Sequence, residues 1–152
     1  MAITTATASS YKLEVLSGTH LAADVYKIAL IKVGHLGTYG AGTTNAGTPG
    51  TGAATTANLG TDEVTGTGYV AGGNTLTGFS PTAHATGGRL DFANSSWATS
   101  TISAVGAMIY NSSKANRVLG VYDFGGTITS TAGTFTATMP AVGDATSLVR
   151  TT

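Results

Sequence analysis

The residues of this chain that could carry acid–base or metal chemistry are few and widely spaced. Asp62 and Glu63 are the only adjacent acids, and an acid–base pair requires two carboxylates that converge on one substrate. The three histidines are isolated, and none stands at metal-ligand spacing from another histidine or a carboxylate. We therefore predict no catalytic residue, no cofactor and no metal, and no acid-rich loop of EF-hand type supports a calcium site. The other candidates weighed in this way are Asp91, Asp123, His20, His35 and His84.

Serine and glycine patterns also point away from enzymatic chemistry. No serine lies in a G-x-S-x-G turn of the kind that exposes a nucleophile. The glycines at Gly66–Gly68 and Gly72–Gly73 do not open a helix after a strand, and no Lys-Ser or Lys-Thr follows them. Such glycines are typical of tight turns between strands. An enzyme, such as a small hydrolase, is the weakest interpretation of this sequence.

Aromatic and leucine side chains remain as candidates for an interface. Trp97, Tyr69 and Tyr39 could form a platform for a sugar or a partner protein, although aromatic side chains more often belong to a core. A carbohydrate-binding module would require Trp97 and a tyrosine to face solvent in one plane. Leu13 and Leu16 fall on one side of a predicted helix, which is too short to be stable without packing on something. These five residues are the predicted interface residues.

The composition favours one mainly β domain and argues against nucleic acid as a partner. The chain has 152 residues, of which 41% are hydrophobic and only 9% charged, and Thr, Gly and Ala dominate. Threonine favours strands and glycine favours turns. Seven basic and seven acidic residues cancel, which argues against binding to nucleic acid. There is no cysteine, no apolar run of membrane-spanning length and no signal-peptide pattern, so we expect neither a disulfide nor a membrane contact.

A β-hairpin over residues 101–126 is the strongest structural pattern, with the polar stretch NSSKAN as its turn. Apolar residues occupy both faces of its strands instead of alternating with polar ones. On the first strand, Met108 and Tyr110 share one face, and Ala107 and Ile109 share the other. Because both faces need cover, the hairpin is predicted to lie deep in a sandwich or partly at a subunit contact.

Shorter elements complete the predicted fold, an antiparallel β-sandwich or barrel (jelly-roll-like) with one short N-terminal helix. The helix is predicted over Tyr11–Ser17, with Ser9 or Ser10 as its N-cap and Gly18 closing it. Trp97 is placed in a Ser/Thr-rich connection. The remaining strands are predicted as Asp24–Val33, two short strands within Thr65–Gly78, Arg89–Asn94, a weakly alternating segment Thr127–Met139 ended by Pro140, and Leu148–Arg150.

Two segments of the single domain 1–152 have almost nothing to bury, an N-terminal arm (residues 1–10) and a Gly/Thr/Ala-rich loop (residues 34–60). A flexible linker and a loop ordered against a neighbouring subunit stay equal alternatives for residues 34–60. Tyr39 is the one large side chain that could anchor this loop. In an assembly, the backbone of both segments is expected to pair with a neighbour's strand edge.

Several blocks of the sequence are distinctive when taken together. They are the start MAITTATASSYKLEVLSG, the strand VYKIAL, the block DEVTGTGYVAGGNTLTG, the run from Trp97 to Asn111, and VYDFGG with TSTAGTFTATMPA. This pattern resembles a family of small structural proteins of tailed bacteriophages, the head decoration or cement proteins. The resemblance covers most of the chain except the loop from about Gly37 to Gly60, which is longer here. Its motifs are turn and core residues, not chemistry.

The resemblance implies a β-sandwich protomer that forms a homo-oligomer, a trimer, on the outer capsid surface of a virion made in a bacterial cytoplasm. The implied partner is the major capsid protein, whose capsomers a cement protein bridges through many symmetry-related contacts. It carries over no catalytic residue. A phage tail or fibre component stays an alternative, although the chain shows neither repeats nor a coiled-coil stem. A carbohydrate-binding module stays a further alternative.

Overall fold

The chain folds into two antiparallel sheets with one short helix near the N-terminus. The structure is a computed structural model that describes residues 1–52, 54, 58–143, 146–147 and 149–151. Strands make up 47% and helices 10% of it, which confirms the predicted mainly β, sandwich-like fold. The elements are β1 (Ala6–Thr7), α1 (Ser9–Leu16), β2 (Tyr26–Lys32), the 3-10 turn η1 (Gly60–Asp62), β3 (Asn74–Thr75), β4 (Ser80–His84), β5 (Gly87–Asp91), β6 (Ser95–Asn111), the 3-10 turn η2 (Ser112–Lys114), β7 (Arg117–Ala137) and β8 (Val149–Thr151).

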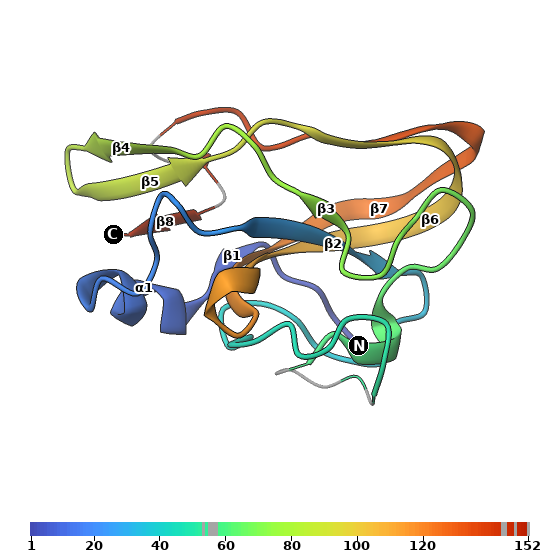
Figure 1. Ribbon diagram of the computed structural model, residues 1–152, viewed down its shortest axis with the longest axis horizontal. Coiled ribbons are helices and arrows are strands. Elements are labelled where there is room, and N and C mark those ends of the chain that lie inside the picture. Colours follow the sequence, from blue (N-terminus) through green and yellow to red (C-terminus); the bar gives the residue numbers. More distant parts are fainter. Residues whose placement is uncertain (53, 55–57, 144–145, 148, 152) are drawn as a thin grey trace.

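The larger sheet has the order β1-β7-β6-β2-β3, and the smaller one has the order β4-β5-β8. The small sheet and α1 lie at one end of the molecule, and the paired strands β6 and β7 extend to the other end (Figure 1). Ile109 of β6 lines the same small cavity as Leu90 and Val149 of the small sheet. The small sheet therefore closes one side of the core against the end of the larger sheet.

The predicted hairpin is confirmed and is longer than expected. β6 and β7 pair from Asn111↔Arg117, next to the turn, to Ser95↔Ala137 at the far end. The segment predicted as a separate strand after residue 126 is the continuation of β7. Trp97 pairs with Phe135 inside β6, so its placement in a connection was wrong. The Ser- and Thr-rich flanks of Trp97 suggest a loop, but backbone pairing with β7 extends through them.

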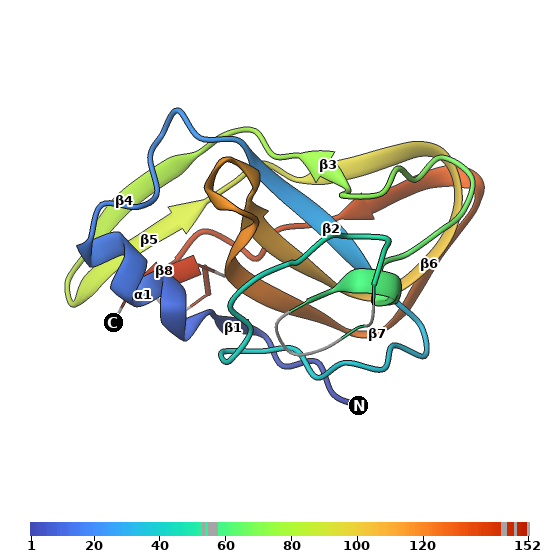
Figure 2. The ribbon, with the colours of Figure 1, turned by 60° about the horizontal axis from the view of Figure 1, so that its bottom comes forward.

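The hairpin bends sharply about two-thirds of the way along β7. The register shifts around Ser100, and Thr99 and Ala132 adopt left-handed φ values of 50° and 49°. Such bulges bend a strand and increase its twist. The Ser100 hydroxyl bridges the bend by bonds to Ser130 Oγ (2.7 Å) and to the Trp97 carbonyl (3.0 Å). The outer ends of both strands consequently turn back over the sheet, as both ribbon views show (Figures 1 and 2).

The two short strands predicted within Thr65–Gly78 are largely absent from the described structure. Only β3 forms, together with an isolated bridge between Thr67 and Thr101. Its backbone N–H groups instead bond within local turns, from Tyr69 to Gly66 and from Gly73 to Val70, and from Gly72 to the Glu63 carboxylate. Turn chemistry therefore replaces strand pairing here.

Other boundaries also differ from prediction. β5 begins two residues before Arg89, and its partner β4, which contains Pro81, was not predicted. Proline is tolerated in β4 because this strand lies at a sheet edge. β8 confirms the last edge strand with a shift of one residue, and Leu148 lies outside the described residues. β2 is confirmed and is trimmed at both ends relative to Asp24–Val33.

The N-terminal helix forms where predicted but packs on a different face. It begins at Ser9 and has no side-chain cap, so the predicted serine cap was wrong. Gly18 closes it as predicted, with φ +66° and with the next amide bonded to the Glu14 carbonyl at 3.0 Å. Its buried residues are Tyr11 and Glu14, and the Leu13–Leu16 side points to solvent.

The N-terminal arm and the long loop bond to their own protomer. Thr7 and Ala6 of the arm form β1 on the edge of β7, and the Tyr39 backbone exchanges hydrogen bonds with the arm at 2.9 and 3.0 Å. Further along the loop, Ala46 N–H donates to the Asn116 carbonyl (2.8 Å) and Val118 N–H donates to the Thr44 carbonyl (3.1 Å). The described parts of both segments thus bond to the hairpin of their own chain, which is not the behaviour of a flexible linker, and pairing of these segments with a neighbouring subunit stays a prediction.

Candidate functional site

The exposed apolar side chains concentrate on α1 and the loop that follows it. Five of the eleven exposed large hydrophobic side chains in the described structure lie between residues 13 and 25. The packing of α1 accounts for part of this concentration, because the helix buries Tyr11 and Glu14 and leaves Leu13 and Leu16 exposed. We call this surface the helix patch; its members are Leu13 (68% exposed), Val15 (39%), Leu16 (86%), Leu21 (50%) and Val25 (43%).

A groove of about 590 Å³ runs beside the helix patch, between α1 and the small sheet. Val15 and Leu21 belong to both the patch and the groove wall, and Phe79, Leu90 and Val149 line the side formed by the small sheet. Figure 2 shows α1 next to this sheet. The groove adjoins the patch through Val15 and Leu21, and exposed apolar side chains beside a groove are typical of an interaction site.

A buried polar network fixes α1 to the end of the hairpin. Glu14 of the helix accepts hydrogen bonds from His20 Nε2 (2.7 Å) and from Arg117 Nη1 at the start of β7. Asn111 Nδ2 donates to His20 Nδ1 (3.0 Å) and to Asp24 Oδ2 (2.8 Å). Because Asn111 donates to Nδ1, His20 carries its proton on Nε2. His20 is therefore a packed histidine that positions the helix patch.

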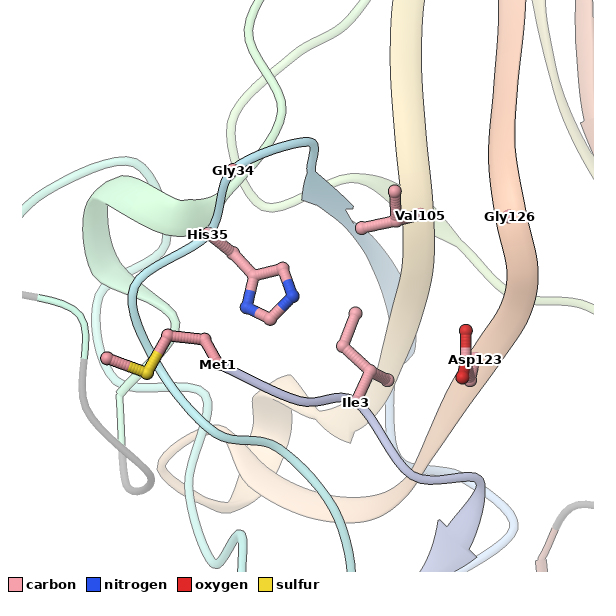
Figure 3. Close-up of a pocket in the computed structure, with 7 residues that line it drawn as sticks. All are labelled: Met1, Ile3, Gly34, His35, Val105, Asp123 and Gly126. Atoms are coloured by element: carbon pink, nitrogen blue, oxygen red, sulfur yellow. The ribbon is translucent and has the colours of Figure 1, made fainter.

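An open hollow of about 470 Å³ lies at the N-terminus, between the arm and the hairpin. Figure 3 shows the His35 ring reaching into it between Met1 and Ile3, with Asp123 of β7 across the hollow. Both polar side chains have local partners: His35 Nδ1 lies 2.9 Å from the Gly37 carbonyl, and Asp123 accepts the Gly125 N–H at 2.9 Å. Within the described residues, no group of three or more His, Cys, Asp or Glu side chains could hold a metal ion.

Asp62, the first of the two adjacent acids, fastens the loop that follows β2. Its buried carboxylate accepts the N–H groups of Leu36 (2.9 Å) and Gly37 (2.7 Å) and the hydroxyl of Tyr39 (2.7 Å). Burial would raise the pKa of Asp62, but these hydrogen bonds and the nearby Lys32 outweigh it and hold the pKa below its ordinary value. Asp62 is therefore a structural anion at neutral pH.

Glu63 points to a different loop and is less well satisfied. Its Oε1 accepts the hydroxyl of Tyr69 and the N–H of Gly72, each at 2.7 Å, while its buried Oε2 has no hydrogen-bond partner. Burial raises the pKa of Glu63, and the two hydrogen bonds and Lys27 offset only part of that effect. The two acids do not converge on one site, so each belongs to the structure of its own loop.

The predicted interface residues divide into two groups. Tyr39 (1% exposed) and Trp97 (4%) are enclosed by the protomer, and the partly buried Tyr69 stacks on Trp97 with ring centroids 5.8 Å apart. The solvent-facing coplanar platform needed for a carbohydrate-binding module is thus not formed by Trp97 and these tyrosines. Leu13 and Leu16, by contrast, are exposed at the centre of the helix patch.

The other members of the helix patch were missed by sequence reasoning. The signal was available in part, because one short helix with a single buried face cannot bury Leu13, Val15 and Leu16 together with Tyr11. Leu21 and Val25 follow the helix, so this argument does not reach them. Of the other chemical candidates, Asp91 lies 3.3 Å from Arg89 in β5. His84 lies in β4, and its side chain is outside the described residues.

Comparison with protein-family models, curated proteins and solved structures finds no match for this chain. None of the described helices is long and apolar enough to cross a membrane.

Proposed function

We propose that this chain is a structural protein of a tailed-bacteriophage virion, a capsid decoration or cement protein. It sits on the outer capsid surface, binds the major capsid protein and stabilises its capsomers by bridging them. It has no catalytic activity and needs no cofactor. The observation that carries the proposal is the helix patch with its neighbouring groove, because five of the eleven exposed large hydrophobic side chains in the described structure lie between residues 13 and 25.

Physical chemistry supports a role in assembly for this surface. Burying apolar area yields about 25 cal/mol per Å², so exposed leucines such as Leu13 and Leu16 favour association. The chain has no net charge, so copies do not repel one another as they crowd on a shell. Many symmetry-related copies also make modest contacts sufficient, because their effects combine across the lattice. A rigid β scaffold with one apolar surface fits this requirement.

We propose a homotrimer as the assembled form, and the number comes from the family resemblance alone. The apolar hairpin no longer argues for a subunit contact, because the chain's own arm and loop cover it. We therefore propose that association uses the helix patch instead of the hairpin.

The test is whether the protein co-purifies with intact particles made from the genome that encodes it, and in what copy number. We expect it on purified heads, at a copy number that matches capsid symmetry. A double variant, Leu13→Ser with Leu16→Ser, is expected to lose most of this occupancy. The matched control replaces two exposed apolar residues outside the patch, Val70→Ser with Val142→Ser, and is expected to retain it.

Two results would contradict the proposal. Recovery with tails but not with heads would assign the protein to the tail or fibre. Absence from particles altogether would remove the virion role. Equal occupancy of both double variants would keep the role but move the contact away from the helix patch.

A further inference from the structure

Glu63 lies at the centre of a hydrogen-bonded junction between three segments of the chain. The Tyr69 hydroxyl donates to Glu63 Oε1 (2.7 Å) and accepts the N–H of Leu30 in β2 (2.9 Å). Gly72 N–H donates to the same carboxylate oxygen, and the Gly72 carbonyl accepts the hydroxyl of Tyr110 in β6 (2.7 Å). We call these contacts the Glu63 junction. Through it, residues 69–73 are held against both β2 and β6.

One oxygen of this carboxyl is buried without a partner. Glu63 is 1% exposed, and Oε2 has no hydrogen bond. The titratable groups that face it are Tyr69 from the loop, Tyr110 from β6 and Lys27 from β2. Burial raises the pKa of both tyrosines above their ordinary value, so they stay neutral donors. The hydrogen bonds from Tyr69 and Gly72 and the charge of Lys27 offset part of the cost of a negative charge at this position.

The two protonation states of Glu63 therefore differ in their fit to the closed junction. A neutral carboxyl keeps the bonds to Tyr69 and Gly72 on Oε1 and leaves only an uncharged O–H at Oε2 without a partner, which costs less than a buried charge. An ionised carboxylate leaves a charged oxygen buried and unpaired, and such a group is costly until water reaches it. Residues 69–73 contact this carboxyl through Tyr69 and Gly72, Gly50 lies beside Oε2, and the Val70 side chain is 73% exposed, so displacement of residues 69–73 would admit water.

We propose that Glu63 is a protonation-controlled switch for the loop of residues 69–73. The loop is closed on β2 and β6 while the carboxyl is neutral, and it opens when the carboxyl ionises. Opening separates Tyr69 from Trp97, against which it stacks at 5.8 Å. This inference is independent of the proposed virion role.

The chain supplies its own reporters for the test. Trp97 is the only tryptophan, and Glu14 and Glu63 are the only glutamates. We would follow Trp97 emission and hydrogen exchange of residues 65–76 in the wild-type protein between about pH 4 and pH 9. With rising pH, Trp97 emission is expected to shift to the red. The protection of this segment, corrected for intrinsic exchange, is expected to fall by up to about tenfold per pH unit, because opening releases one proton.

Three variants and one direct measurement separate the switch from general pH effects. Glu63→Gln is expected to abolish the transition, because its side chain cannot ionise. Tyr69→Phe is expected to hold the loop partly open at every pH. The control Asp123→Asn is expected to titrate like the wild type, because Asp123 lies away from the junction. Should Glu63→Gln fail to fold, ¹³C-glutamate NMR of the wild type gives two carboxyl signals, of which the Glu63 signal is expected to titrate together with Trp97 emission.

The proposal is overturned if Trp97 emission and exchange of residues 65–76 stay constant over this pH range. It is equally overturned if Glu63→Gln retains the wild-type transition, or if the Glu63 carboxyl signal titrates separately from the Trp97 change.

Discussion

The two halves of the β6–β7 hairpin have nearly the same backbone pairing but opposite surroundings. In the inner half, residues 106–111 of β6 and 118–121 of β7 are all buried. In the outer half, residues 125–134 of β7 are exposed except for Ser130 and the half-buried Gly133. Small and polar residues fill residues 125–134 of β7 apart from Ile128, and the inner half holds large apolar residues such as Met108 and Leu119. Beyond the bend, Trp97 and Phe135 are buried again. The two strands therefore pair along their whole length, and the side chains in each half decide whether other segments of the chain must cover it.

The cover of the inner half comes from segments with little apolar content. Ile3 of the arm lies against Gly106, the Tyr39 backbone bonds to the arm, and Asp62 holds the Tyr39 hydroxyl. Backbone hydrogen bonds and the buried Asp62 carboxylate thus hold these covering segments against the inner half of the hairpin. We therefore predict that the stability of the inner half depends on these contacts and that the stability of the outer half does not.

A charge placed in each half should give the largest contrast. Val121→Asp puts a carboxylate at a fully buried position between Met108 and Ala6, and we expect a loss of about 4 kcal/mol or more in the free energy of unfolding. The matched variant Ile128→Asp lies in the outer half, where Ile128 is 41% exposed, and should cost less than about 1 kcal/mol. Urea unfolding of both variants checks this. Equal losses would contradict the division of the hairpin into two halves.

Removal of the Asp62 carboxylate should have the second-largest effect on the free energy of unfolding. Asp62→Ala leaves the N–H groups of Leu36 and Gly37 and the Tyr39 hydroxyl without their acceptor, and we expect a loss of about 3 kcal/mol. Asp123→Ala is the control, because Asp123 accepts one local bond from Gly125, and it should cost no more than about 1 kcal/mol. If the two variants were equally stable, the loop of residues 34–39 would not be fastened by Asp62.

The same carboxylate should shape the acid side of the stability profile. The pKa of Asp62 is lower in the folded chain than its ordinary value, so its contribution is complete above about pH 4 and is lost as the pH falls through the folded pKa. Asp62→Asn should remove this part of the acid-induced loss of stability. Unfolding midpoints measured between about pH 2 and pH 5 check the sign, and an unchanged acid slope in the variant would contradict it.

A methyl group at Gly106 should have a smaller effect that reports on the arm. A Cβ there would lie 2.6 Å from the Tyr122 carbonyl and 2.9 Å from Ile3 Cδ1, so Gly106→Ala should cost about 1–3 kcal/mol. Ile3→Ala in the same chain should recover part of this loss. A double-mutant cycle from urea unfolding measures the coupling. Strict additivity would mean that the arm does not press on this part of β6.

The smallest effect on stability is expected at the helix patch. Leu13→Ser with Leu16→Ser should change the free energy of unfolding by no more than about 0.5 kcal/mol, because both side chains are mostly exposed. A loss comparable to that of Asp62→Ala would show that these leucines stabilise the protomer, and would remove them as candidates for a partner contact.

The hairpin, the helix position and the final edge strand were predictable because each depends on local sequence patterns. The cover of the hairpin was not, because it depends on long-range backbone bonds such as Ala46 to Asn116, which leave no periodicity in the sequence. Leu13 and Leu16 were predicted as interface residues on one side of the helix, and the structure places both at the surface. Their role in a partner contact stays a prediction. The burial of Glu14, which pairs with Arg117 at the start of β7, accounts for their exposure, because a different side of the helix turns inward.

The length of the β6–β7 pair also has a consequence for folding kinetics. Its strands are joined by one short turn, so their pairing closes only a small loop of chain. β2 must instead find β6 across most of the sequence, as the bond between Val25 and Ser113, 88 residues apart, illustrates. Contacts between distant residues form late because closing a long loop costs more entropy. The hairpin is therefore expected to form early, and its apolar inner half stays open to solvent until β2 pairs with it and the arm and loop dock. During that interval the nascent chain is most prone to aggregate.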